Sequence, residues 1–292
     1  MTNTSNPPLE IQHDQIDPVV LEAIRKIDEI AHQHETAYFL AGATAREIML
    51  RHVFGRPPGR RTLDVDLGIA VRDWDHFKVL KTALVERGGY QPHARKVQRI
   101  TYPSKPAVIV DLIPFGGVET PERTIAWPPE EDIVMRVTGF SDGLESAVPV
   151  RLDENLIIPV VSLPVLLVLK LFAWTDRKHE MRDAPDIYTL LRQYGDAGNE
   201  DRLFGEDMNV LEAEGYDFEL AGALLIARDA ARVVSADTQK HLREILASDA
   251  LMEELTNQII VSSGRNDPEH VRKCEALVSK MCEGFLQAHE IS

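Results

Sequence analysis

Residues 39–71 decide the fold, and they read FLAGATAREIMLRHVFGRPPGRRTLDVDLGIAV. The segment begins as a short apolar strand, turns at Gly42 into a helical pattern, passes through a loop rich in proline and glycine, and ends in a second strand. That second strand carries two carboxylates, Asp64 and Asp66, within its apolar pattern. Charge directed into a core costs stability, so these two side chains either face water or hold a ligand.

The two carboxylates share one face of their strand. Residues two apart in a strand point the same way, so Asp64 and Asp66 lie on one side while Val65 and Leu67 lie on the other. Their Cα atoms are expected about 6.5 Å apart, which lets both side chains ligate one hard cation. Taken alone, such a pair of aspartates more often lies on the solvent-exposed face of a half-buried strand than in a metal site.

A third carboxylate strengthens the metal prediction. Asp111 interrupts another apolar strand pattern, AVIVDLIPF, which forms a predicted hairpin with ARKVQRITY. Three acidic residues on two strands of one sheet repel one another unless cations neutralise them. The sequence therefore predicts that Asp64, Asp66 and Asp111 bind Mg²⁺ or Mn²⁺.

Upstream of the acidic pair, the turn at Gly42 and Ala43 joins a strand to a helix. Such a turn exposes unpaired backbone N–H groups at the positive end of the helix dipole, where a phosphate can bind. A routine strand-to-helix turn is the alternative. Arg46, in the first turn of the helix, either points at the same phosphates or lies on a solvated face.

These motifs resemble the nucleotidyltransferase superfamily, whose fold is shared by DNA polymerase β, poly(A) and CCA-adding enzymes and antibiotic nucleotidyltransferases. The resemblance rests on Gly42-Ala43, on Asp64-Val65-Asp66 and on Val110-Asp111-Leu112. It implies that the three aspartates are catalytic and that the Gly42 turn holds the phosphates of an NTP. Ala43 departs from the superfamily pattern, because it lacks the Ser hydroxyl that often helps to hold a phosphate.

Within the superfamily, residues 36–195 resemble the AbiEii/AbiGii group, the toxin half of type IV toxin–antitoxin pairs. The resemblance includes Thr62, two residues before the first aspartate, and the run SLPVLLVLKLFAWTDRKHEMRDAPDIYTLL. It implies that Lys170, a lone charge in an apolar helix, contacts the triphosphate, and that Asp183 contributes to the same site, with Thr62 and Arg46 as further nucleotide contacts. Asp183 could instead be a plain N-cap, with Asp186 stabilising the first turn of the following helix.

The order of the predicted elements gives an α+β fold. A nucleotidyltransferase-like mixed β-sheet flanked by helices is expected over residues 1–155, with a helix that starts at Asp17 and Pro18 and a second hairpin formed by AVPVRL and LIIPVV. A mainly helical domain is expected over residues 156–292, contributing Lys170 and Asp183 to the cleft. Its predicted helices are 163–177, 186–194, 219–234, 237–248 and 267–288.

The composition limits the possible partners. The chain has 292 residues, of which 32 are basic and 47 acidic, and the net charge of −15 counts against broad non-specific binding of nucleic acid. The loop from Arg51 to Arg61 is a local basic exception. No stretch approaches the roughly 20 apolar residues of a membrane span, and no secretory signal is visible at the N-terminus, so we expect no membrane contact and a cytoplasmic location.

We expect a metal-dependent enzyme that moves an NMP from an NTP to an acceptor hydroxyl and releases pyrophosphate. The resemblance implies a toxin that acts on tRNA, which the loop from Arg51 to Arg61 would contact, and a cognate antitoxin protein. The acceptor could also be an antibiotic-like small molecule or a protein side chain. A non-catalytic member that binds a partner protein is the remaining alternative, favoured by Ala43 and opposed by the three intact carboxylates.

Overall fold

The structure is a computed structural model that describes residues 7–13, 15–57, 63–129 and 131–287. The chain divides into two compact units, residues 1–162 and residues 163–292. The boundary predicted after residue 155 lies before the one in the structure. The last strand of the first sheet, Leu156–Val160, lies between the two boundaries in the sequence. That strand pairs with neighbours in the first unit, so hydrogen bonding places it there despite the change in composition nearby.

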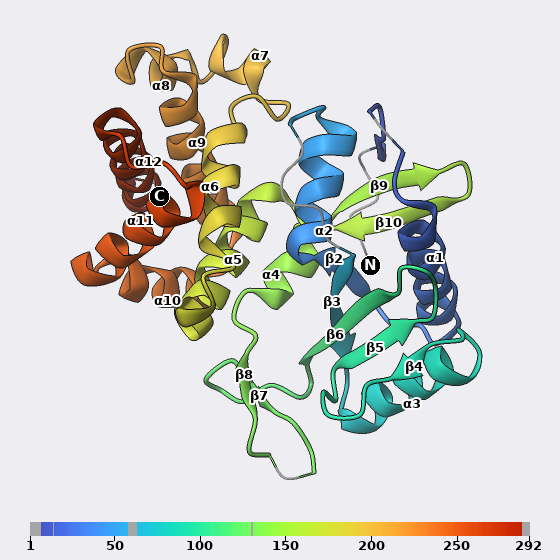
Figure 1. Cartoon of the computed structure of the whole chain (residues 1–292). Coiled ribbons are helices and arrows are strands. Elements are labelled where there is room, and N and C mark those ends of the chain that lie inside the picture. Colours follow the sequence, from blue (N-terminus) through green and yellow to red (C-terminus); the bar gives the residue numbers. More distant parts are fainter. Residues whose placement is uncertain (1–6, 14, 58–62, 130, 288–292) are drawn as a thin grey trace. The chain divides into compact units, whose positions relative to one another are not determined.

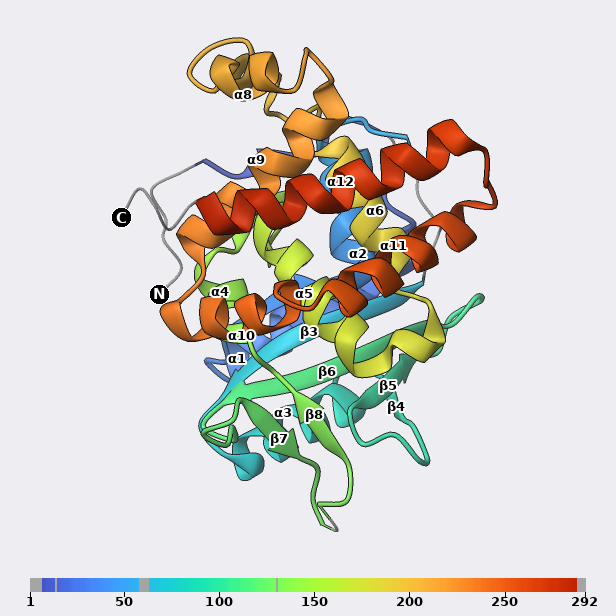
Figure 2. The same cartoon turned by 90° about the vertical axis from the view of Figure 1, so that its left-hand side faces the viewer.

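The first unit is built on an eight-stranded mixed sheet in the order β1-β9-β10-β2-β3-β6-β5-β4 (Figure 1). Its strands are β1 Leu9–Glu10, β2 Tyr38–Ala41, β3 Asp64–Val71, β4 Gln91–Pro92, β5 Arg99–Tyr102, β6 Val108–Gly116, β9 Val148–Asp153 and β10 Leu156–Val160. The central strand β3 runs antiparallel to β2 and parallel to β6. Figure 2 shows β3, β6, β5 and β4 following one another across the sheet.

The predicted hairpins are confirmed, since β5 pairs with β6 and β9 with β10, both antiparallel. A further hairpin of β7 (Thr124–Ala126) and β8 (Val134–Arg136) was not predicted. Its strands are three residues long, and Val134 is 62% exposed, so no apolar alternation marks them in the sequence.

Helices cover both faces of the sheet. Helix α1 (Pro18–Gln33) starts as predicted, with Asp17 accepting a hydrogen bond of 3.0 Å from the Val19 N–H. It packs with α3 (Trp74–Glu86) on the face to which Tyr38 points, where the Tyr38 hydroxyl donates to Asp28 at 2.7 Å. The short helix α4 (Phe140–Glu145) packs on the opposite face through an aromatic cluster of Phe39, Phe115 and Phe140.

The second unit is helical, as predicted. Its α-helices are α5 Leu163–Arg177, α6 Ala184–Gln193, α7 Glu200–Leu203, α8 Met208–Ala213, α9 Phe218–Val233, α10 Ala236–Leu246, α11 Asp249–Ser263 and α12 Pro268–Gln287. Helices α9 and α12 approach so closely at Gly284 that a Cβ there would lie 2.5 Å from the Leu224 carbonyl oxygen. Helix α11 differs from the prediction. The sequence pattern predicted only that the preceding helix ends at residue 248, whereas the Ser248 side chain caps the start of a further helix there. Among the helices of the described residues, none is long and apolar enough for a membrane crossing.

Candidate active site

Four neighbouring strands align one row of residues across the centre of the sheet. Ala41 of β2 pairs with Asp66 of β3, Asp66 with Asp111 of β6, and Asp111 with Arg99 of β5. Paired residues on adjacent strands point to the same face, with strands about 4.8 Å apart. Asp64 lies two residues before Asp66 and therefore shares its face. The sheet register thus brings the three predicted aspartates together.

The alternation of burial along β3 agrees with this placement. Val65 and Leu67 are almost fully buried, whereas Asp64 is exposed and Asp66 is half-buried. Asp111 is half-buried between two buried residues of β6. The carboxylates therefore occupy the accessible side of strands whose other side forms the core.

The Gly42 turn lies directly against this row. Gly42 opens helix α2 (Gly42–Glu47) with a φ of +67°, and a Cβ at this position would lie 1.9 Å from Oδ2 of Asp66. Only glycine meets both conditions, a left-handed backbone and the absence of a side chain beside the carboxylate. Ala43 follows in the same first turn, and α2 continues into a π-helical segment, Ile48–Val53. The first two sequence motifs are thus in contact.

A buried threonine that was not singled out in the sequence fixes the same turn. The Thr44 hydroxyl donates a hydrogen bond of 2.6 Å to the backbone carbonyl of Asp64, and Thr44 is 6% exposed. This bond ties the start of α2 to the start of β3, so that Gly42 and Asp64 are held in place together. A threonine two residues after the glycine of a strand-to-helix turn was the only signal available.

Arg46 is buried, with 3% of its surface exposed. The alternative that it lies on a solvated face is therefore wrong. Burial lowers the pKa of its guanidinium from the ordinary value, and the charge of Glu47 opposes this shift. A role of Arg46 in phosphate binding stays a prediction.

Arg99 completes the row, although no pattern in the sequence marks it. Its Nε donates to Oδ1 of Asp111 at 2.8 Å, and its second nitrogen donates to Oδ2 at 2.6 Å. The hydrogen bond with Asp111 raises the pKa of Arg99, burial opposes the shift, and the charges of Asp64 and Asp66 add to it. Its position opposite Asp111 follows from the hairpin register, which the sequence pattern leaves undetermined.

The oxygen atoms of the three aspartates are suitable donors for a hard divalent cation. Among the residues that the structure describes, no three His, Cys, Asp or Glu side chains are arranged so that they could hold a metal ion. Both oxygens of Asp111 accept hydrogen bonds from the Arg99 guanidinium in this structure. The chemistry of the three carboxylates suits the predicted ion, and metal binding by Asp64, Asp66 and Asp111 stays a prediction.

Lys170 lies in the second unit, buried on α5 among carboxylates. Its ammonium is 3.0 Å from Oδ1 of Asp183 and 2.6 Å from Oδ2 of Asp186. Asp183 also accepts two hydrogen bonds from Arg177, at 2.8 and 3.0 Å. The anion that this buried lysine needs is thus supplied by the protein in this structure, and its predicted contact with a triphosphate stays a prediction.

Asp183 does not cap α6 with its side chain, although it is the residue before the helix. The plain capping alternative is therefore wrong. Burial raises the pKa of Asp183, but hydrogen bonds and charge from Arg177 and Lys170 outweigh this and hold the pKa below its ordinary value. The Asp183 side chain is 2% exposed, and it is ionised at neutral pH because two cations surround it.

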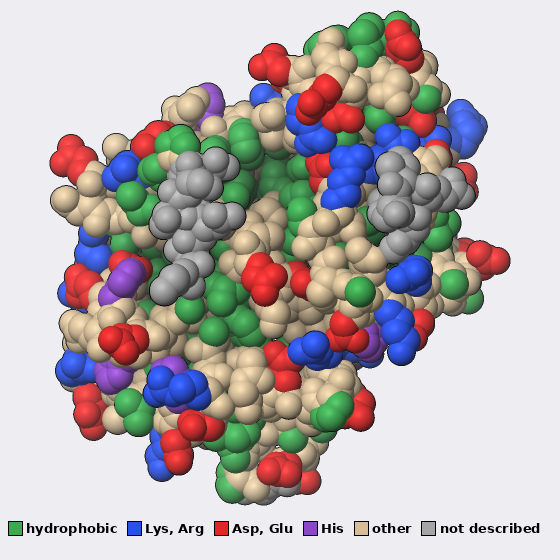
Figure 3. Space-filling view, turned by 180° about the vertical axis from the view of Figure 1, so that it is seen from behind, with side chains coloured by type: hydrophobic (Ala, Val, Ile, Leu, Met, Phe, Trp, Pro, Cys, Tyr) green, Lys and Arg blue, Asp and Glu red, His purple; other side chains and the backbone are tan. Residues whose placement is uncertain are grey.

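The predicted RNA-binding loop is described only in part. Arg51 forms an ion pair of 3.2 Å with Glu47, and Nε of Arg56 donates to the Phe54 carbonyl at 3.1 Å. Residues 58–62 lie outside the described residues, and with them Arg60, Arg61 and the predicted nucleotide contact Thr62. On the face drawn in Figure 3, Lys and Arg side chains lie among Asp and Glu side chains.

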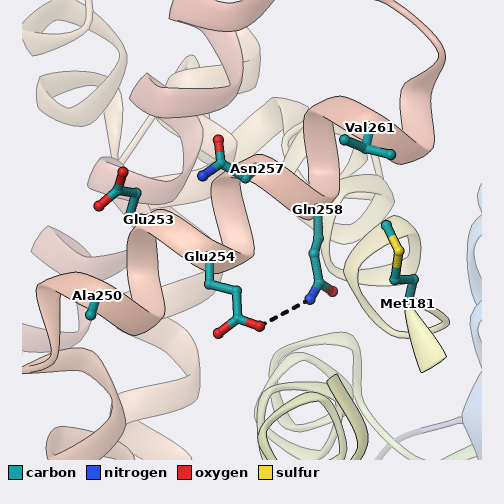
Figure 4. A pocket seen from close by; sticks show the side chains of 7 residues that line it. All are labelled: Met181, Ala250, Glu253, Glu254, Asn257, Gln258 and Val261. Atoms are coloured by element: carbon teal, nitrogen blue, oxygen red, sulfur yellow. Dashed lines mark hydrogen bonds between the residues drawn. The ribbon is translucent and has the colours of Figure 1, made fainter. Parts of the chain in front are cut away.

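A surface pocket of about 310 Å³ lies in the second unit (Figure 4). It is lined by Met181 and six residues of α11: Ala250, Glu253, Glu254, Asn257, Gln258 and Val261. Glu254 and Gln258 are joined across one helical turn by a hydrogen bond of 3.5 Å. The lining contains none of the predicted site residues.

Residues 28–262 match the sequence model of a family described as the nucleotidyl transferase AbiEii toxin of type IV toxin–antitoxin systems. No curated protein sequence matches the chain.

Among solved structures, the antibiotic-resistance factor ANT(2'')-Ia is 12% identical over 69% of this chain and 99% of its own, with a TM-score of 0.36. An antigenic nucleotidyltransferase-like protein from Paracoccidioides brasiliensis is 15% identical over 67% of this chain and 90% of its own, with a TM-score of 0.38. A CCA-adding enzyme in complex with CTP is 11% identical over 94% of this chain and 83% of its own, with a TM-score of 0.24. At these TM-scores the structural similarities carry no argument, and the assignment rests on the sequence match. The chain belongs to the AbiEii family of type IV toxin–antitoxin systems and is a nucleotidyltransferase.

Proposed function

We propose that this nucleotidyltransferase moves an NMP from an NTP to an acceptor hydroxyl in a reaction that requires Mg²⁺ or Mn²⁺. One observation carries the proposal, namely the in-register pair of Asp66 and Asp111, with Asp64 on the same face and the Gly42 turn against Asp66. Carboxylates placed beside a phosphate-binding turn suit a reaction whose substrate combines negative phosphates with divalent cations.

Asp64, Asp66 and Asp111 would hold the ions. Bound divalent ions neutralise phosphate charge and make an acceptor hydroxyl easier to deprotonate. A carboxylate oxygen of Asp111 accepts the proton of the acceptor hydroxyl. The deprotonated acceptor oxygen is then the nucleophile that attacks the α-phosphorus of the NTP. The backbone N–H groups of Gly42 and Ala43 hold the leaving phosphates in line with the attack, so that pyrophosphate departs from a site that already stabilises its charge.

We propose tRNA as the acceptor, with the loop from Arg51 to Arg61 as its contact, and a cognate antitoxin as the protein partner. Membership of a toxin–antitoxin family supports the antitoxin partner, and the resemblance of residues 36–195 to toxins of this group is the ground for tRNA. The net charge of −15 restricts RNA contact to a local basic surface. A small neutral acceptor, as in antibiotic modification, remains the second candidate because it does not need such a surface.

The proposal is tested by incubating the full-length protein with each labelled NTP and total RNA, with Mg²⁺ and with EDTA. Label that enters tRNA only with the metal is the expected result, and the Asp66→Asn variant is the matched control. Binding of unlabelled tRNA is then titrated with salt, because phosphate contacts give a steep dependence of affinity on salt concentration. Label that appears in small molecules or protein contradicts the tRNA acceptor. A protein whose melting temperature moves with neither Mg²⁺ nor any NTP would be a binding module instead.

A further inference from the structure

Arg99 stands at the end of the row that carries the three aspartates, and it engages the oxygens that a metal ion would need. Its two hydrogen bonds to Asp111 are parallel and short, 2.8 and 2.6 Å. The side chains of Arg99 and Asp111 are 20% and 17% exposed, so water screens this pair only in part. Parallel bonds of this kind fix the orientation of a carboxylate as well as neutralise it.

The charge of Arg99 also reaches the other two aspartates. Asp64 and Asp66 both interact electrostatically with its guanidinium. The positive charge of Arg99 therefore acts on all three aspartates of the row, and most strongly on Asp111, with which it is hydrogen-bonded. A divalent cation at the same carboxylates would do the same work and would repel the guanidinium.

We propose that Arg99 is a positioning residue that neutralises and orients Asp111 in the metal-free protein and that a divalent cation displaces when it binds. This inference rests on the proposed function, because it takes Asp111 as a metal ligand. Metal binding and release of the ion pair are then one event. The cation binds more weakly than three undisturbed carboxylates would bind it, and the acidic row stays intact in its absence.

The test is a calorimetric titration of Mn²⁺ into the metal-free full-length protein and its Arg99→Gln variant. Removing a competing charge from the site is expected to tighten Mn²⁺ binding by about tenfold. The Arg99→Lys variant keeps the charge but not the two parallel donors, so its affinity should lie between the other two. Arg151→Gln is the matched control, since it breaks an exposed ion pair of 3.0 Å with Glu10 elsewhere in the same sheet, and its Mn²⁺ affinity should equal that of the wild type.

Thermal unfolding supplies a second measurement that does not depend on turnover. In EDTA, Arg99→Gln should melt at a lower temperature than the wild type, and Mn²⁺ should raise its melting temperature by a larger amount. A folded Arg99→Gln variant that binds Mn²⁺ no more tightly than the wild type overturns the role of Arg99 and leaves the metal site standing. If the wild type, Arg99→Gln and Asp66→Asn all fail to bind Mn²⁺, the metal requirement of the proposed function falls together with this inference.

Discussion

The backbone of Gly42 and the carboxylate of Asp66 are in such close contact that a Cβ at position 42 would lie 1.9 Å from Oδ2 of Asp66. This contact joins the turn after β2 to the central strand β3, and it places backbone N–H groups beside an acidic side chain. The same glycine has a φ of +67°, which other residues adopt only with strain. Gly42 therefore links two motifs that lie more than twenty residues apart in the sequence.

The Gly42→Ala substitution is expected to abolish activity and to lower the free energy of unfolding by about 2–4 kcal/mol. Backbone strain accounts for part of this loss, and displacement of Asp66 by the new methyl group accounts for the rest. Urea unfolding and labelled-nucleotide transfer measure the two effects. Gly89→Ala is the matched control, because Gly89 has a φ of +77° and nothing within 4 Å of its Cβ position. That variant should lose about 1 kcal/mol and keep its activity; equal behaviour of the two variants would contradict the importance of the contact with Asp66.

The three aspartates should differ in their effect on stability while sharing their effect on turnover. Asp64→Asn and Asp66→Asn remove repulsion from the metal-free acidic row, so we expect an unchanged or slightly increased free energy of unfolding and no measurable transfer. Asp111→Asn removes the partner of Arg99 and should cost about 1–2 kcal/mol. Unfolding in EDTA separates the three variants. Full activity of either Asp64→Asn or Asp66→Asn with Mg²⁺ and an NTP would be incompatible with the proposed site.

Lys170→Met is expected to destabilise the protein by about 3–5 kcal/mol, because it leaves Asp183 and Asp186 buried with one cation fewer. The matched control is Lys178→Met, which breaks an ion pair with Glu254 whose side chains are 40% and 39% exposed. That control should change stability by less than about 0.5 kcal/mol. If both variants unfold at the same urea concentration, the buried network contributes nothing that the surface pair does not.

The same variant also tests the predicted contact between Lys170 and the triphosphate. Nucleotide affinity is measured under conditions in which Lys170→Met is folded, next to Arg177→Gln, which loses a partner of Asp183 but keeps the lysine. A phosphate contact predicts weaker NTP binding in Lys170→Met alone. Equal weakening in both variants would assign Lys170 a purely supporting role.

The sequence was sufficient for the parts of the fold that alternate strongly between apolar and polar residues. The placement of the three aspartates on one face, the Gly42 turn and the β5–β6 and β9–β10 hairpins could be predicted, because these elements combine regular apolar patterns with residues that interrupt them. The short β7–β8 hairpin could not. Arg99 and Thr44 could not be found in this way. Their partners are an aspartate and a backbone carbonyl on other elements, and those pairings depend on register and packing rather than on local pattern.

Asp183 also shows that a local sequence pattern does not determine the partner of a side chain. Its place before α6, with Pro185 and Asp186 after it, is a standard start of a helix, and that local pattern gave capping equal weight with a functional role. The structure turns the side chain away from the helix and toward Lys170 and Arg177 instead. A buried lysine thirteen residues upstream competed for the carboxylate, and depriving a buried charge of its partner costs about 3–5 kcal/mol, more than the roughly 1 kcal/mol that a cap contributes.

The ion pairs of Asp183 with Lys170 and Arg177 predict that the stability of the protein depends on pH in the acid range. Because the pKa of Asp183 is lower in the folded protein than in the unfolded chain, the ionised carboxylate stabilises the fold at a pH above its unfolded pKa of about 4. That contribution is lost as the pH falls through the folded pKa. The difference in free energy of unfolding between the wild type and Asp183→Asn should therefore be largest above about pH 5 and should shrink steadily below about pH 4. Urea unfolding at a series of pH values measures it, with Glu254→Gln as a control that should differ little from the wild type throughout. A difference that is constant between pH 7 and the acid limit of folding would mean that Asp183 supports the helical unit through its shape and hydrogen bonds, and not through its charge.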